Sequence, residues 1–235
     1  MSAPDLPVGE PAFWPSQYTA ALLHVLRLHA EWVRGARVLE IGCGSGVLLA
    51  AAGTLGAAAL CGVDVEPAAV AATRRLLQGL DPDAEVEVHQ GDLFAPVNGR
   101  RFDLIVANLP HFPMETAALG DRLPSWSSGG ADGRSLLDPF VAGLGGHLTP
   151  SGRAVIAHNA FVDLDATKTA ASRQGLRVGV AAKVLVDLPP PKLARMTPGV
   201  LRREAGRSIH LYGGLAFGEI LVLTIGRDHV AGDPP

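Results

Sequence analysis

Short apolar stretches recur along the chain, and longer segments with apolar positions every three or four residues separate most of them. The short stretches predict β-strands, and the longer segments predict helices. The predicted strands cover residues 38–41, 58–63, 86–89, 102–107, 154–157, 177–186 and 217–225, and the predicted helices cover residues 17–33, 47–55, 67–78, 135–144 and 164–174.

Strands that alternate with helices indicate βαβ units, which form a parallel sheet. We therefore expect a Rossmann-like α/β fold, with a mostly parallel seven-stranded sheet and helices on both faces. In such a sheet, ligands bind beyond the carboxyl ends of the strands. The residues that directly follow each strand are therefore the first candidates for a functional site.

The first part of the chain differs from this alternating pattern. Residues 1–15 are rich in proline and predict an extended arm, and Ser16 is placed to cap the helix predicted over 17–33. We expect two parts, an N-terminal arm and helix over residues 1–34 and a cofactor-binding domain over residues 35–235.

Composition narrows the class of protein. The chain has 235 residues, 48% of them hydrophobic, and a formal net charge of −3, so it can form one sizeable core and carries no overall positive charge that would attract nucleic acid. Its two cysteines do not form a CxxC pair. The N-terminus lacks a signal-peptide pattern, and the apolar stretch 47–60 is too short to span a bilayer. We expect a cytoplasmic protein without a membrane partner.

A glycine-rich turn follows the first predicted strand, in the sequence Glu40-Ile41-Gly42-Cys43-Gly44-Ser45-Gly46. Alternate glycines let the backbone turn tightly and approach a ligand closely, although an ordinary glycine turn has the same pattern. The GxGxxG pattern of dinucleotide-binding proteins requires a glycine at position 47, where this chain has valine.

Acidic residues follow the next two strands. Asp64 lies before Val65 and 22 residues beyond Gly42, a spacing at which a carboxylate binds ribose hydroxyls, although it could instead cap the next helix. Asp92 precedes Leu93 after the third strand, where a carboxylate could accept the adenine amine or simply form a turn.

Together these three segments resemble the class I methyltransferases that use S-adenosylmethionine, over roughly residues 36–160. In that family, VLEIGCGSG is the first motif, an acid after the second strand holds ribose, and an acid after the third recognises adenine. The resemblance implies S-adenosylmethionine as the cofactor. It implies a cofactor site formed by Glu40, Gly42, Cys43, Gly44, Gly46, Asp64, Val65, Asp92, Leu93 and Asn108.

Asn108-Leu109-Pro110-His111 follows the fourth strand. Methyl transfer requires the nucleophile, the methyl carbon and the sulfur to lie in line, so the acceptor must be held in one orientation. An asparagine side-chain oxygen and a backbone carbonyl can each accept one N–H of a planar amine or amide. A simple loop with an asparagine turn is the alternative.

This segment resembles the (Asn/Asp/Ser)-Pro-Pro-(Tyr/Phe) motif of amino methyltransferases, which modify adenine N6, guanine N2 or a glutamine amide. Residues 129–134 and 14–19 also resemble segments of the release-factor glutamine methyltransferases. The chain departs from the motif at Leu109 and His111. Phe112 could then provide the stacking aromatic ring, and His111 could instead act as a general base. We therefore predict catalytic roles for Asn108 and Pro110, as the resemblance implies, and for His111 as the possible general base.

Three other residues are candidates for the acceptor pocket. His158 and Asn159 follow the fifth strand, and Trp126 lies in the long segment after the Asn108 motif. Packing or helix-entry roles are the alternatives for these residues. The segment 189–207 is predicted to be a loop, either simply solvated or acting as a lid or partner surface, and its positive charges are Lys192, Arg195, Arg202, Arg203 and Arg207.

The favoured function is methyl transfer from S-adenosylmethionine to a nitrogen of a protein, peptide or small molecule. Structured RNA stays open as an acceptor, and we expect neither duplex DNA nor a metal site. The alternatives are an O-methyltransferase of a small metabolite with His111 as base, a non-catalytic binding module with the same fold, and a nicotinamide dehydrogenase. The sequence determines neither the acceptor nor the oligomeric state.

Overall fold

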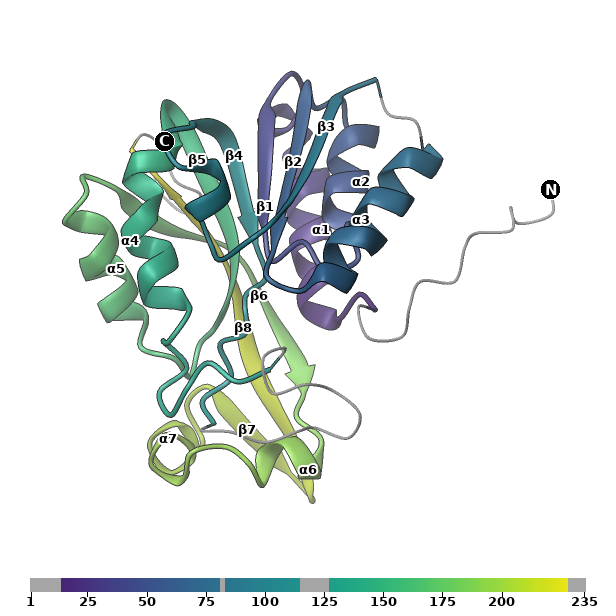
Figure 1. The fold of residues 1–235 in the computed structure, drawn as a ribbon. Coiled ribbons are helices and arrows are strands. Elements are labelled where there is room, and N and C mark those ends of the chain that lie inside the picture. Colours follow the sequence, from purple (N-terminus) through teal and green to yellow (C-terminus); the bar gives the residue numbers. More distant parts are fainter. Residues whose placement is uncertain (1–13, 81–82, 115–126, 228–235) are drawn as a thin grey trace.

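A computed structural model describes residues 14–80, 83–114 and 127–227. Its centre is a twisted sheet with the strand order β3-β2-β1-β4-β5-β8-β6, to which the short β7 adds by pairing with β8 (Figure 1). Strands β1 to β5 run parallel, and β8 is antiparallel to both β5 and β6. The strands are β1 (Arg37–Ile41), β2 (Ala59–Asp64), β3 (Glu85–Gln90), β4 (Phe102–Ala107), β5 (Leu148–Asn159), β6 (Arg177–Asp187), β7 (Ile209–Tyr212) and β8 (Leu215–Gly226).

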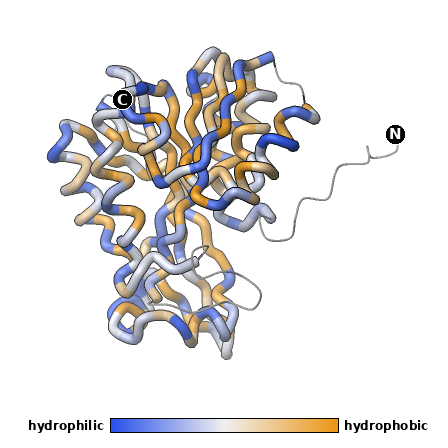
Figure 2. Tube along the Cα trace, in the orientation of Figure 1, coloured by the Kyte–Doolittle hydropathy of each residue, from blue (hydrophilic) through white to orange (hydrophobic). Residues whose placement is uncertain are grey.

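Helices cover both faces of this sheet, as the sequence predicts. One apolar cluster joins the sheet to α1 (Gln17–Leu28), α2 (Val47–Thr54) and α3 (Pro67–Leu80), and a second joins its other face to α4 (Leu137–His147) and α5 (Leu164–Ser172). The central strands are apolar on both faces because both faces are covered. Figure 2 shows the hydrophobic residues concentrated along these strands.

The predicted element boundaries differ most from the structure in three places. The first helix ends at Leu28, and a short 3₁₀ helix, Ala30–Trp32, follows it. The fourth helix begins two residues later and ends three residues later than predicted. Strand β5 begins at Leu148, six residues before the predicted start, because Leu148 already pairs with Phe102 of β4, ahead of a register shift. The remaining 3₁₀ helix is Ala95–Val97.

The segment 189–207 is not the predicted loop. It forms two short helices, α6 (Pro190–Leu193) and α7 (Pro198–Glu204), each of which has proline in its first turn. A proline there costs no hydrogen bond, because the first N–H groups of a helix have no partner within it. Met196 and Val200 bury their side chains in the core and so hold this segment against the sheet. Strand β7, which the sequence did not predict, follows directly.

None of the helices in the described part of the chain has both the length and the apolar character needed to cross a membrane.

Candidate active site

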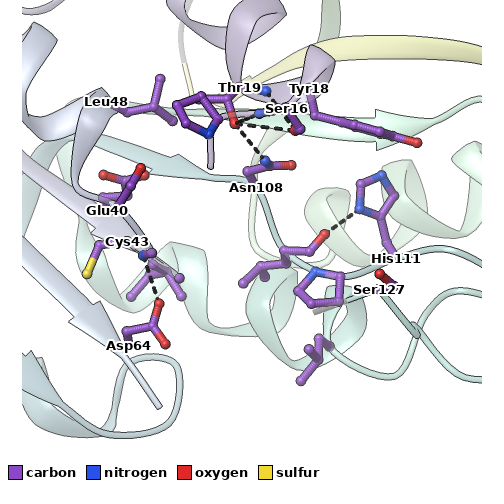
Figure 3. Close-up of a pocket in the computed structure, with 18 of the residues that line it drawn as sticks. Ser16, Tyr18, Thr19, Glu40, Cys43, Leu48, Asp64, Asn108, His111 and Ser127 are labelled. Atoms are coloured by element: carbon purple, nitrogen blue, oxygen red, sulfur yellow. Dashed lines mark hydrogen bonds between the residues drawn. The ribbon is translucent and has the colours of Figure 1, made fainter. Parts of the chain in front are cut away.

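A cavity of about 800 Å³ lies at the carboxyl ends of the parallel strands. This volume is within the range of small-molecule and cofactor sites. Figure 3 shows Glu40, Cys43 and Asp64 on one side of the cavity and Tyr18, Asn108 and His111 on the other. The predicted cofactor residues and the predicted acceptor residues therefore face one common space.

The glycine turn after β1 has the backbone that only glycine adopts readily. Gly42, Gly44 and Gly46 have φ angles of +73°, +51° and +78°. A Cβ at Gly46 would come within 2.9 Å of the Thr73 side chain, so α3 packs directly against the turn. Thr73 also donates its hydroxyl to the Gly44 carbonyl over 3.1 Å.

Asp64 connects the glycine turn to the end of β2. Its Oδ2 accepts the Gly44 N–H over 2.9 Å, and its Oδ1 accepts the Glu66 N–H over 2.9 Å. The bond to Glu66 is the local one expected of a residue before a helix, and the bond to Gly44 fixes the turn. A carboxylate has about four acceptor positions, so Asp64 retains capacity for ribose hydroxyls.

The third cofactor segment also lies on the cavity. Asp92 is exposed and lines it, and the Gly91 N–H donates to the Asp64 carbonyl over 2.9 Å. Leu93 has a φ of +45°, which is rare for a residue with a side chain. Such strained backbone is concentrated at ligand sites. Val65, the predicted companion of Asp64, also lines the cavity.

Glu40 tests whether these residues fit the expected cofactor. Its side chain lines the cavity and is buried, and its Oε2 has no hydrogen-bond partner in the described structure. Burial, backed by the nearby Asp64 charge, raises the pKa of this carboxyl well above its usual range. A cationic ligand would stabilise the charged form of this carboxyl and interact with its unpartnered oxygen. S-adenosylmethionine carries a sulfonium and an ammonium group. The donor set therefore fits the cofactor.

The acceptor side is built on the segment after β4. Asn108 is half-buried, and its Nδ2 donates to Thr19 Oγ1 over 3.3 Å. Pro110 lines the same cavity. His111 is buried, and its Nδ1 donates to the Leu109 carbonyl over 2.5 Å, which leaves Nε2 without a partner among the described residues.

Asn159 holds this segment from the end of β5. Its Nδ2 donates to the His111 carbonyl over 3.1 Å, and its Oδ1 accepts the Tyr18 hydroxyl over 2.7 Å. The Tyr18 ring also meets the His111 ring edge-on, with 5.7 Å between centroids. Burial, partly offset by the bond to Asn159, raises the pKa of Tyr18, so the phenol stays protonated as a donor.

The Gly129–Arg134 motif supports the same segment from outside the cavity. Phe112 donates its N–H to the Ser127 carbonyl over 3.2 Å and accepts the Gly129 N–H over 2.9 Å. A Cβ on Gly129 would lie 2.6 Å from the His111 Cα, and one on Gly133 would lie 2.8 Å from the His111 carbonyl oxygen. Both glycines are needed for this close backbone packing.

Of the other predicted acceptor residues, His158 does not line the cavity, and Trp126 cannot be placed relative to it. The His158 side chain is fully buried and lies 3.0 Å from Thr167 Oγ1, and it is not among the residues that line the cavity, so the structure does not bring it together with the other predicted acceptor residues. Its ring points into the α5 side of the sheet because adjacent residues of a strand face opposite sides. Trp126 lies outside the described residues.

The cavity also contains residues that the sequence did not single out for the site. Tyr18 and Thr19 line it, and they belong to the segment 14–19 that resembles the glutamine methyltransferases. Lys192 from α6 lines it as well, with its ammonium 4.7 Å from the centroid of the Phe112 ring. Asp187, at the end of β6, also lines the cavity, and no motif in the sequence pointed to it.

One group of metal-ligand type occurs in the described part of the chain, outside this cavity. Cys61, Glu87 and His89 bring ligand atoms within 4.8 Å of one another. Glu87 already pairs with Arg100 over 2.7 Å, and a cation there would compete with the guanidinium. The group has no part in the cofactor site.

Comparison with known proteins agrees with this geometry. Residues 19–114 match the family of ribosomal protein L11 methyltransferases. Over 155 residues the chain is 30% identical to a protein of Methanocaldococcus jannaschii that is named, provisionally, a protein N5-glutamine methyltransferase, with 66% of this chain and 77% of that one aligned. It is 35% identical over 124 residues to the release factor glutamine methyltransferase of Geobacter sulfurreducens, over 50% of this chain and 43% of that one.

Solved structures share the fold at low sequence identity. The ribosomal protein L11 methylase of Lactobacillus delbrueckii subsp. bulgaricus has a TM-score of 0.58 and 19% identity, over 94% of this chain and 84% of that one. The 16S rRNA N2 G1207 methyltransferase of T. thermophilus, solved with AdoMet and guanosine, has a TM-score of 0.56 and 20% identity, over 95% of this chain and 46% of that one.

The fold and its cofactor site define a class I S-adenosylmethionine-dependent methyltransferase. Within this class, the chain belongs to the protein N5-glutamine methyltransferase family. Apart from the archaeal relative, the chain spans only 27% to 54% of the length of the first curated relatives that it matches.

Proposed function

We propose that this enzyme methylates the side-chain amide nitrogen of a glutamine in a protein. The observation that carries the proposal is the position of Asn108 and Pro110, which line the same cavity as the glycine turn and Asp64. Their two oxygens can accept the two N–H groups of a primary amide. Bound in the cavity, S-adenosylmethionine supplies an electrophilic methyl group.

Orientation is the main task of the protein in this reaction. The lone pair of an amide nitrogen is delocalised into the carbonyl, so the nitrogen reacts only when its π face points at the methyl carbon. Two acceptors in fixed positions hold the amide plane in that orientation. The bonds that Asn159 donates to the His111 carbonyl and that Asn108 donates to Thr19 Oγ1 support such a fixed position.

His111 favours this proposal over oxygen methylation. Burial, reinforced by the nearby Lys192 charge, lowers the pKa of His111 to about 4 despite the opposing bond to the Leu109 carbonyl. A base with that pKa takes little part in proton abstraction from an alcohol at neutral pH. The neutral ring instead supports the loop that holds Asn108.

The names of relatives support a protein acceptor. Those that match this chain include release factor glutamine methyltransferases and a ribosomal protein uL3 glutamine methyltransferase. Release factors and ribosomal proteins are therefore the first acceptors to test.

The test incubates the enzyme with labelled S-adenosylmethionine and purified release factors, ribosomal proteins and ribosomal RNA, followed by mass spectrometry of the products. We expect a 14 Da increase on a glutamine side chain. Replacing that glutamine by asparagine in the acceptor should abolish labelling. Labelling of RNA, or of a hydroxyl or amine group of a protein, would contradict the proposal.

Asn108→Ala tests the orienting role. We expect kcat to fall about tenfold or more, because one hydrogen bond to the acceptor is lost. Asn98→Ala is the matched control, because Asn98 is exposed and does not line the cavity. Equal activity of the two variants would remove Asn108 from the proposed site.

A further inference from the structure

The carboxamide of Asn108 can serve the proposed reaction in only one of its two orientations. Its oxygen can accept an acceptor N–H, whereas its NH₂ group cannot. The two orientations have nearly the same shape, so steric packing does not select between them. A hydrogen-bond partner is needed to determine which end of Asn108 faces the acceptor.

Thr19 is in the position to make that selection. Asn108 Nδ2 donates to Thr19 Oγ1 over 3.3 Å, and Thr19 is 8% exposed. In the described structure, no hydrogen bond reaches the Asn108 Oδ1, and Figure 3 shows this oxygen on the far side of the carboxamide from Thr19. The oxygen is thus left available on the acceptor side.

The Thr19 hydroxyl is itself held by the start of α1. Its Oγ1 accepts the Ser16 N–H over 3.2 Å, and it lies 3.4 Å from the Ser16 Oγ. Ser16 in turn caps the helix by accepting the Thr19 N–H, so the two residues form a reciprocal capping box. With its proton directed to the Ser16 Oγ, the Thr19 hydroxyl presents acceptor lone pairs to Asn108, and it cannot turn away without breaking this cap.

The neighbouring residue acts on the other end of the same loop. Tyr18 donates to Asn159, and Asn159 donates to the His111 carbonyl. The first turn of α1 therefore contacts the acceptor loop near Asn108 and, through Asn159, near His111. These links join residues 89 and 141 positions apart in the chain.

We infer that Thr19 is a positioning residue, which accepts a hydrogen bond from Asn108 Nδ2 and so turns the Asn108 oxygen toward the methyl acceptor. This inference rests on the proposed function, because it assigns Oδ1 to an acceptor N–H. It gives the capping box of α1 a second role, as the fixed reference for the orientation of Asn108.

The test compares Thr19→Val, which keeps the shape but removes the hydroxyl, with Thr19→Ser, which keeps the hydroxyl. Thr54→Val is the matched control, because the Thr54 hydroxyl donates to the Ala50 carbonyl on α2 and does not contact the cavity. Two readouts are measured. One is the ¹⁵N–¹H signal of the Asn108 side-chain NH₂ in the full chain, assigned with Asn108→Ala, and the other is kcat and KM with any acceptor that the wild type methylates.

We expect Thr19→Val to shift the Asn108 NH₂ signal and to lower kcat about tenfold, with the KM for S-adenosylmethionine unchanged. Thr19→Ser and Thr54→Val should keep both the signal and kcat. A Thr19→Val enzyme with wild-type kcat, or a Thr19→Ser enzyme as impaired as Thr19→Val, would overturn the inference. If the wild type methylates none of the acceptors, the proposed function fails. The NH₂ signal of Asn108 then decides the role of Thr19 by itself. An unchanged signal in Thr19→Val would overturn the inference.

Discussion

At the scale of single residues, the cofactor side of the cavity contains a buried carboxyl group that lowers the stability of the fold. Glu40 is buried, its Oε2 has no partner in the described structure, and burial raises its pKa. An isolated protein is destabilised by such a group. The cost is consistent with a site that becomes electrostatically complete when a cation binds.

Glu40→Gln should separate the loss of stability that the buried carboxyl causes from its contribution to cofactor binding. Above pH 4.5 an unfolded Glu40 releases its proton while the folded one retains it, so this carboxyl lowers the stability of the cofactor-free protein as the pH rises. The variant should therefore melt at a higher temperature than the wild type at pH 8, with little difference near pH 4.5. It should also bind S-adenosylmethionine about tenfold or more weakly by calorimetry. The exposed Glu85→Gln is the control and should change neither quantity.

At the scale of elements, the glycine turn lies between β1 and α2, and residues of β2 and α3 contact it. Gly46 lies at the start of α2 with φ +78°, and α3 packs against it through Thr73. The turn is thus restricted both by its own backbone and by a neighbouring helix.

Gly46→Ala tests this restriction. We expect a loss of roughly 2–4 kcal/mol in the free energy of unfolding, because the positive φ and the overpacking against Thr73 both carry a cost. Gly35→Ala shares the positive φ, at +73°, but its Cβ would meet nothing within 4 Å, so it should lose only about 1 kcal/mol. Urea unfolding of the two variants measures the difference. Equal losses would mean that α3 does not restrict the turn.

At the scale of the whole molecule, one sheet brings the cofactor half and the acceptor half together. The cofactor half comes from β1 to β3, and the acceptor half comes from β4, β5, α1 and α6. Because all of these elements share the cavity, ligand binding and pH should affect the stability of the entire fold.

S-adenosylmethionine at about 100 times its Kd should stabilise the fold by about 2.7 kcal/mol. For a chain of this size, the melting temperature should rise by about 5–11 °C. NAD at the same concentration should produce no shift, and Asp64→Ala should lose most of the shift. A shift with NAD alone would favour a dinucleotide-binding protein instead.

Two buried histidines should make the fold sensitive to acid. Burial lowers the pKa of His111 to about 4 and that of His158 to about 3, with His111 also lowering the latter. Below about pH 6.5 the unfolded chain binds protons that the folded chain does not, so the stability present at neutral pH is lost as the pH falls toward 4. Urea unfolding between pH 7.5 and 5 should show this decline. It should be smaller in His158→Gln and unchanged in the control His24→Gln, which replaces an exposed histidine on α1.

The cofactor half could be predicted from sequence because its determinants are local. Gly42, Gly44 and Gly46 lie within one short turn after β1, Asp64 ends β2, and Asp92 comes shortly after β3. Parallel strands align their carboxyl ends, so these positions must meet at one edge of the sheet. The same local rules failed for 189–207, where tertiary packing of Met196 and Val200 stabilises two short helices in a polar segment.

The sequence by itself determined the α/β class, the glycine turn that is expected to bind the cofactor and the motif that carries Asn108. Only the tertiary structure decided what surrounds that motif: Thr19 and Tyr18 come from the first helix, Lys192 comes from α6, and His158 turns away into the core. Periodicity and motifs report on neighbours along the chain, whereas these contacts depend on how the first helix and the last strands pack against the sheet. The physical reason is that a hydrogen bond between distant residues leaves no local pattern in the sequence.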